Sequence, residues 1–194
     1  MKALAKLNKL YPELCAAENA LKSGKTPISV SGATGSEKNQ LIYSFAENTG
    51  KKALVIASDE LSAKEIYADI SSMSGENVLF FRAKEYVFYD VDVSAREIEA
   101  ERINVIKNIK NADFIVTSAA AIMQYTVKKE IFDFYCKTYS AGDIIDVSKL
   151  AETLVETGYK RVSQVEGHGQ FSIRGSIIDI FFPGDIYGTR IELF

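Results

Sequence analysis

The stretch PISVSGATGSEKN at residues 27–39 is the most informative part of this 194-residue sequence. Its apolar start at 27–30 is typical of a short β-strand, and the glycines that follow are typical of a tight turn. Residues 38–48 then carry Leu41, Ile42 and Phe45 at helical spacing. The stretch therefore predicts a strand, a glycine-rich turn and a helix in succession.

This succession is the setting of a P-loop, G-x-x-x-x-G-K-[ST], whose backbone N–H groups wrap phosphates and whose hydroxyl holds magnesium. Glu37 replaces the second glycine and adds a carboxylate where phosphate would approach, and Asn39 replaces the hydroxyl. Three interpretations stay open: a P-loop that has lost its ligand, an ordinary turn, and a working nucleotide site. We favour the first and expect no cofactor at this degenerate P-loop, which comprises Gly32, Gly35, Glu37, Lys38 and Asn39.

The alternation of strands and helices continues to about residue 130. Apolar runs that predict further strands lie at 53–57, 78–81 and 114–117. The run at 53–57 is continuous, which is typical of a strand buried on both faces. Helices are expected over 1–22, from the Ser62/Glu65 capping box to about Met73, and after a second capping box at Ser94 and Glu97. We therefore expect residues 1–130 to form an α/β domain of the P-loop NTPase-like (RecA-like) type, a parallel sheet with helices on both faces.

The pattern changes near residue 131. Aromatic residues alternate with polar ones at 132–136, which predicts a strand, and Asp146 is placed to cap a helix over 147–156. Further strands are expected at 159–165, 170–182 and 190–194. Residues 131–194 thus predict a second, small antiparallel α+β domain. Because the sequence stops within an apolar strand pattern, we expect the chain to be a fragment of a longer protein.

Composition excludes several classes of protein. The 23 basic and 26 acidic residues give a net charge of −3, so a generally basic nucleic-acid-coating protein is excluded and we expect DNA binding by this chain to be weak. No apolar run has the length of a membrane span or signal peptide, which predicts a cytoplasmic protein without membrane contact. Cys15 and Cys136 are too few for a zinc site.

Isolated polar residues give no catalytic or metal site. His168, the single histidine, lies between glycines in an expected turn and is interpreted as a solvated loop residue. Asp179 lies in an apolar strand without a partner base, so we interpret it as a structural carboxylate bonded to backbone or arginine rather than an acid catalyst.

Six stretches carry a resemblance to known repair proteins. Apart from Glu37 and Asn39, the loop at 32–38 resembles the nucleotide loop of the UvrB excision-repair helicase. The bacterial transcription-repair coupling factor family, Mfd, is resembled by EYVFYDVDVS at 85–94, GYKRV at 158–162, QVE at 164–166, GQFSIRGSIIDIFFPGD at 169–185 and RIELF at 190–194. The damaged loop favours the second family, whose N-terminal module is similar to UvrB but has lost its ATPase motifs. The chain is thus similar to a UvrB-like module of Mfd, with domain 1a over 1–130 and the UvrA-interacting domain 2 over 131–194.

The resemblance implies a function. It implies a non-catalytic module that recruits UvrA, linking displacement of stalled RNA polymerase to nucleotide excision repair. ATP, magnesium, DNA and RNA polymerase would be bound by motor and other domains absent from this sequence. Two alternatives remain: a nucleotide-dependent repair helicase of the UvrB type, and an autoinhibitory lid that makes an intramolecular contact with the rest of Mfd.

The same resemblance assigns UvrA binding to Arg174, Arg190 and Phe194. Alternation places Ser172 and Arg174 on one strand face, with Phe171 and Ile173 toward the core. UvrB has an arginine at the position of Ser172, so one contact is expected to be missing here. Phe194, four residues after Arg190, is either exposed on the same face or buried in the core. The long DNA-clamping hairpin of UvrB has no counterpart, and we interpret Tyr86, Phe88 and Tyr89 as core residues rather than base-stacking platforms.

Overall fold

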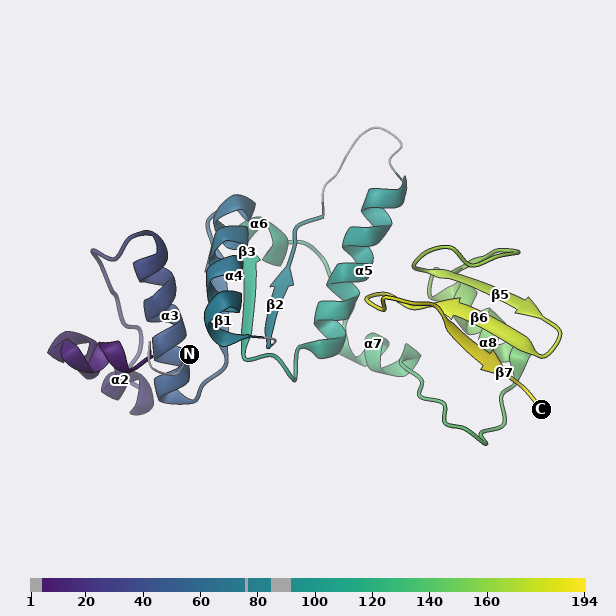
Figure 1. The fold of residues 1–194 in the computed structure, drawn as a ribbon, viewed down its shortest axis with the longest axis horizontal. Coiled ribbons are helices and arrows are strands. Elements are labelled where there is room, and N and C mark those ends of the chain that lie inside the picture. The colour runs from purple at the N-terminus through teal and green to yellow at the C-terminus, as the bar shows by residue number, and fades with distance from the viewer. Residues whose placement is uncertain (1–4, 76, 85–91) are drawn as a thin grey trace. The chain divides into compact units, whose positions relative to one another are not determined.

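The computed structural model describes residues 5–75, 77–84 and 92–194, which form two compact units (Figure 1). Unit 1 contains the chain up to residue 83 together with 105–123, and unit 2 contains 84–104 and 124–194. The domain boundary expected at residue 130 remains a prediction. Tyr86, Phe88 and Tyr89 lie outside the described residues. Within those residues, no helix combines the length and hydrophobicity needed to cross a bilayer.

Unit 1 is built on a parallel three-stranded sheet in the order β1-β3-β2. The strands are β1 (Ala53–Ala57), β2 (Val78–Phe81) and β3 (Phe114–Ser118). Helices connect the strands and lie on both sides of the sheet, which confirms the α/β class.

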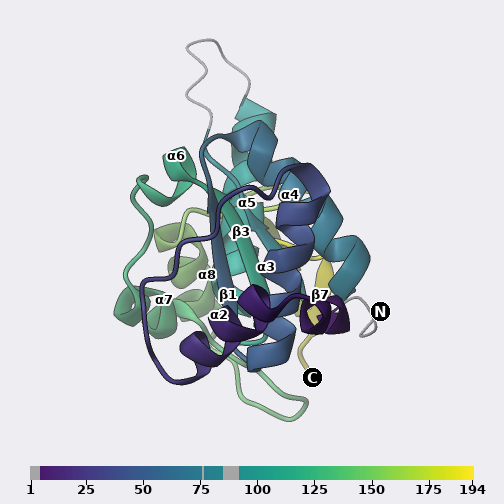
Figure 2. The same ribbon diagram turned by 90° about the vertical axis from the view of Figure 1, so that its left-hand side faces the viewer.

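The helices of unit 1 lie before, between and after these strands in the chain. They are η1 (Lys6–Leu10), α2 (Pro12–Lys22), α3 (Gly35–Thr49), α4 (Glu60–Ser74) and α6 (Ala119–Ile122), and α5 (Asp92–Asn108) runs from unit 2 into unit 1. α3 and α4 pack side by side (Figure 2). Their buried side chains meet those of the strands in one core that includes Tyr43, Ala46, Ile66, Ile70, Phe114 and Val116.

Three predictions for unit 1 were wrong. Residues 27–30 form no strand, because no neighbouring strand pairs with them. The helix expected over 1–22 is divided at Pro12, which starts α2 and leaves Tyr11 in an extended conformation, as the residue before proline prefers. β1 is not buried on both faces, since Leu54 is 55% and Ile56 52% exposed.

Unit 2 contains a four-stranded sheet in the order β4-β5-β6-β7, covered on one face by α8 (Val147–Glu156). The strands are β4 (Lys160–Arg161), β5 (Gln170–Arg174), β6 (Ile177–Phe181) and β7 (Thr189–Glu192). The core between helix and sheet contains Leu150, Leu154, Phe171, Ile178 and Ile180. Asp146 caps α8 by accepting a hydrogen bond from the Lys149 N–H at 3.1 Å, which confirms the helix and its predicted cap.

Unit 2 also departs from the sequence predictions. Residues 129–135 form the helix α7 (Lys129–Tyr135) instead of a strand, and an ion pair joins Lys129 to Asp133 across one turn of it. The single strand expected over 170–182 is the hairpin β5–β6, which turns at 175–176 with Gly175 at φ +61°. β4 pairs parallel to β5, so the sheet is mixed rather than antiparallel throughout.

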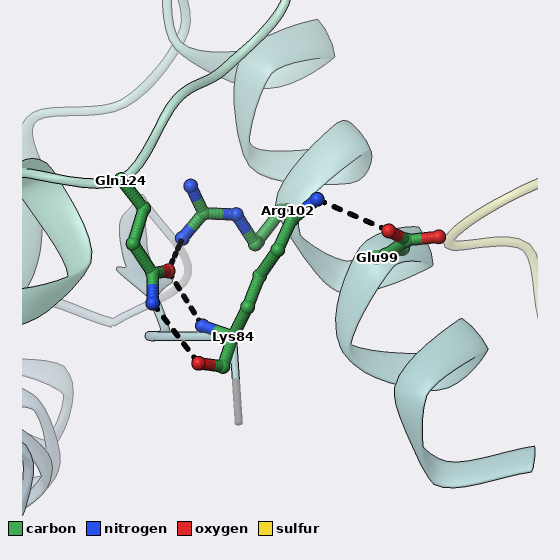
Figure 3. A network of polar contacts seen from close by, with 4 residues as sticks. All are labelled: Lys84, Glu99, Arg102 and Gln124. Atoms are coloured by element: carbon green, nitrogen blue, oxygen red, sulfur yellow. Dashed lines mark hydrogen bonds and ion pairs between the residues drawn. The ribbon is translucent and has the colours of Figure 1, made fainter. Parts of the chain in front are cut away.

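A polar cluster joins the two segments of unit 2 (Figure 3). The side-chain amide of Gln124 accepts a hydrogen bond from the Lys84 N–H at 2.7 Å and donates one to the Lys84 carbonyl at 2.9 Å. The buried Arg102 donates to the same Gln124 oxygen at 3.3 Å, and Lys84 forms an ion pair with Glu99. The cluster thus fastens residue 84 to residue 124 and to α5.

The start of α4 shows how a local signal fixes an element. Asp59 accepts a hydrogen bond from the Ser62 N–H at 2.8 Å and further ones from the hydroxyls of Ser58 and Ser62. These donors, the Ser62 N–H foremost, lower the pKa of the Asp59 carboxyl to about 2. The helix therefore begins at Glu60 with an aspartate cap, ahead of the predicted capping box at Ser62 and Glu65.

We expect Asp59→Ala to lower the melting temperature by a few degrees at pH 7, because α4 loses its capping acceptor. The folded pKa is depressed relative to the unfolded value of about 3.9, so this stabilisation is present above roughly pH 4 and is lost as the pH falls further. Thermal melts followed by circular dichroism between pH 7 and pH 3 measure the difference. Ser62→Ala is the control, since it keeps the backbone donor and should have a smaller effect. A difference between parent and Asp59→Ala that grows as the pH falls would contradict the assignment.

Candidate functional site

The glycine-rich loop lies at the surface before α3 and lacks the strand of a P-loop. Gly32 and Gly35 adopt φ values of +92° and +52°, a region that favours glycine. Apart from its neighbours in the chain, a Cβ atom at either position would meet no atom within 4 Å, so the positive φ angles are the constraint that favours glycine here. Glu37 and Lys38 are exposed in the first turn of α3.

Asn39, at the position of the magnesium-binding hydroxyl, makes a structural contact instead. The residue is 5% exposed, and its side-chain N–H donates to the Asp69 carboxylate of α4 at 2.8 Å. This bond ties α3 to α4 beneath the loop. The side chain is therefore held between two helices, not presented to a ligand above the loop.

A second set of predicted residues lies on the face of the β5–β6–β7 sheet opposite α8, here called the arginine face. Its charged members are Arg174, Asp179, Arg190 and Glu192. Phe171, Ile178 and Ile180 alternate with them and point into the core. Phe194 follows β7 by two residues and is fully exposed.

Asp179 joins the two arginines of this face. Arg190 donates from Nε to Oδ1 at 2.7 Å and from Nη2 to Oδ2 at 3.0 Å, and Arg174 donates from Nη2 to Oδ2 at 2.7 Å. The arginines belong to β5 and β7, so they flank β6 rather than lying on adjacent strands. The interpretation of Asp179 as a carboxylate bonded to arginine is confirmed.

The charges of this cluster stabilise one another. Hydrogen bonds from Arg190 and then Arg174 hold the pKa of the Asp179 carboxyl below its usual range, against the opposing effect of burial. The same bond with Asp179 raises the pKa of Arg190. Because the carboxylate pKa is lowered on folding, the cluster contributes to stability above about pH 4 and loses that contribution in more acidic solution.

Two neighbours of the arginine face differ from expectation. Ser172 is 1% exposed, and its hydroxyl lacks a hydrogen-bond partner among the described residues. His168 is partly buried rather than solvated. Its Nε2 lies 2.9 Å from the Asp185 carbonyl and its ring packs on Phe181 at a centroid distance of 4.5 Å, so it joins the loops before β5 and after β6.

Comparisons with known proteins show which proteins this chain is similar to. A family profile described as "UvrB interaction domain" matches residues 138–194, which include the whole arginine face. The transcription-repair-coupling factor of Bacillus subtilis is 31% identical over 91% of this chain. UvrABC system protein B of Thermosipho africanus is 29% identical over 84% of it, and that of Proteus mirabilis is 27% identical over 90%.

The chain spans 15% of the coupling factor and 27–28% of these two UvrB proteins. The similarity nevertheless extends through both units, and the sequence resemblance to these repair proteins is confirmed. Residues 138–194 match the UvrB interaction domain profile, and the chain is similar to a UvrB-like module of transcription-repair-coupling factors and to the corresponding part of UvrB proteins.

Proposed function

We propose that this chain is a non-catalytic module that recruits UvrA. It would act within a transcription-repair coupling factor that links the displacement of stalled RNA polymerase to nucleotide excision repair. The observation that carries the proposal is the match to the UvrB interaction domain over 138–194, which includes two exposed arginines on one sheet face and the exposed Phe194. RNA polymerase, DNA, ATP and magnesium would be bound by other parts of the longer protein.

The arginine face has the chemistry of a protein-docking surface. Arg174 and Arg190 are 56% and 54% exposed, and each guanidinium keeps N–H donors beyond those that bind Asp179. Planar guanidinium groups pair with carboxylates through two parallel hydrogen bonds. Phe194 adds an exposed aromatic ring of the kind that anchors protein interfaces. An acidic surface of UvrA with a shallow apolar pocket is the complementary partner.

The alternative of a nucleotide-dependent enzyme of the UvrB type is less well supported. Glu37 places a carboxylate at the phosphate position, and Asn39 is engaged with Asp69. The strand that would precede the loop is missing from residues 27–30.

We expect Arg174→Ala to weaken UvrA binding by about 30-fold or more, since breaking a partnered charge at a buried interface costs about 2–5 kcal/mol. Its melting temperature should stay near that of the parent, because exposed ion pairs contribute little to stability. Arg161→Ala is the matched control: Arg161 is an exposed arginine of β4, aligned with Phe171 and so directed away from the arginine face. Titration of each variant with purified UvrA measures the affinities. If Arg174→Ala binds within about twofold of Arg161→Ala, the docking surface lies elsewhere.

We also expect the chain neither to bind nor to hydrolyse ATP. Calorimetry with ATP and magnesium should give no binding heat at micromolar protein, and parallel phosphate-release assays should stay at background. The double variant Glu37→Gly with Asn39→Thr removes the carboxylate and restores the hydroxyl. It should recover at most weak binding of ATP and no hydrolysis. Micromolar affinity of the parent chain for ATP would contradict the non-catalytic assignment.

A further inference from the structure

The two exposed arginines of the arginine face, Arg174 and Arg190, share one partly buried acceptor, Asp179. The Asp179 side chain is 15% exposed, whereas the two arginines are more than half exposed. Both oxygens of Asp179 are occupied, since Oδ1 accepts from Arg190 and Oδ2 accepts from both arginines. Asp179 therefore has little surface to offer a partner, but it contacts both groups that do.

Long arginine side chains lose conformational freedom when a partner immobilises them, and this loss opposes binding. Two bonds to Asp179 hold the guanidinium of Arg190, and one holds that of Arg174, before any partner arrives. The carboxylate is itself fixed, because β6 is the central strand between β5 and β7. Much of the ordering of the docking arginines is thus already present in the free chain.

The charge balance of the arginine face also indicates that the positions of the guanidinium groups matter for binding. Arg174 and Arg190 carry two positive charges, and Asp179 and Glu192 on the same face carry two negative ones. The sum is zero, so long-range attraction of a partner is weak. Affinity must then come from short-range hydrogen bonds, whose strength depends on where the guanidinium groups are held.

We infer that Asp179 is the positioning residue of this face: it fixes the guanidinium groups of Arg174 and Arg190 in the arrangement that pairs with carboxylates of the partner. The inference rests on the proposed function and extends it, because Asp179 acts through the arginines without contacting UvrA itself. It assigns a binding role to a side chain that would otherwise count only as part of the fold.

This role is tested by measuring association and dissociation rates on immobilised UvrA. Four proteins are compared: the parent chain, Asp179→Asn, Arg174→Ala and Glu156→Gln. Asp179→Asn removes the charge at nearly constant shape. It should dissociate about tenfold faster than the parent while its association rate stays equal or rises, because the face gains positive charge. Glu156→Gln makes the same change in net charge on α8, away from the arginine face, and should keep the parent's dissociation rate. A loss of folded protein would lower the binding amplitude and would not raise the dissociation rate.

A second experiment measures how mobile the arginine side chains are in the free parent chain. It does not depend on whether Asp179→Asn folds. By nitrogen relaxation, the Nε–H group of Arg190 should be more restricted than that of the exposed Arg161. Equal mobility of these two groups would overturn the inference. So would an Asp179→Asn dissociation rate within about twofold of the parent, provided that Arg174→Ala has weakened binding. If the parent chain itself fails to bind UvrA, the proposed function falls and this inference falls with it.

Discussion

The register of β5, β6 and β7 is the constraint on which the arginine face of unit 2 depends. Phe171 pairs with Ile180, and both side chains lie in the core against α8. Asp179 pairs with Arg190, and both charges lie on the opposite face. A slip of one residue would move the arginines into the core and the apolar residues into water. Unpaired charges in an apolar core are strongly unfavourable. Hydrophobic burial therefore fixes the position of Arg174 and Arg190 as firmly as it fixes the fold.

Elements with local signals could be predicted, and elements that need a distant partner could not. α8 begins after Asp146 as its cap and apolar pattern indicate, because both signals lie within a few residues. Residues 27–30 have a strand-like composition, but a strand exists only where another strand pairs with it. The alternation of aromatic and polar residues at 132–136 is also typical of a strand. In the structure these residues lie in or next to the short helix α7.

Arg174 and Arg190 are exposed, and Asp179 joins them, a connection that the sequence did not predict. Their role in UvrA binding, and that of Phe194, remains a prediction. In a single strand over 170–182, the offset of five residues would have placed Arg174 and Asp179 on opposite faces. The hairpin turn at 175–176 pairs Arg174 with Ile177 instead, and so brings both charged residues to one face. The glycine at position 175 was the sequence signal for that turn, since two-residue hairpin loops often require glycine. In the structure Gly175 has the positive φ that such a turn needs.

A surface that recruits a protein partner in DNA repair has to favour carboxylates over the phosphates of nucleic acid. Non-specific affinity for a polyanion rises with the number of cations free to neutralise phosphates. Two unpaired arginines would present that kind of surface, whereas Asp179 and Glu192 bring the charge of the face to zero. The guanidinium N–H groups of Arg174 and Arg190 can still donate hydrogen bonds. Their spacing can fit one arrangement of acceptor atoms on a partner better than another. Under the proposed function, the carboxylate that contacts both arginines also reduces their attraction to DNA, so that specificity and low background binding would have one physical cause.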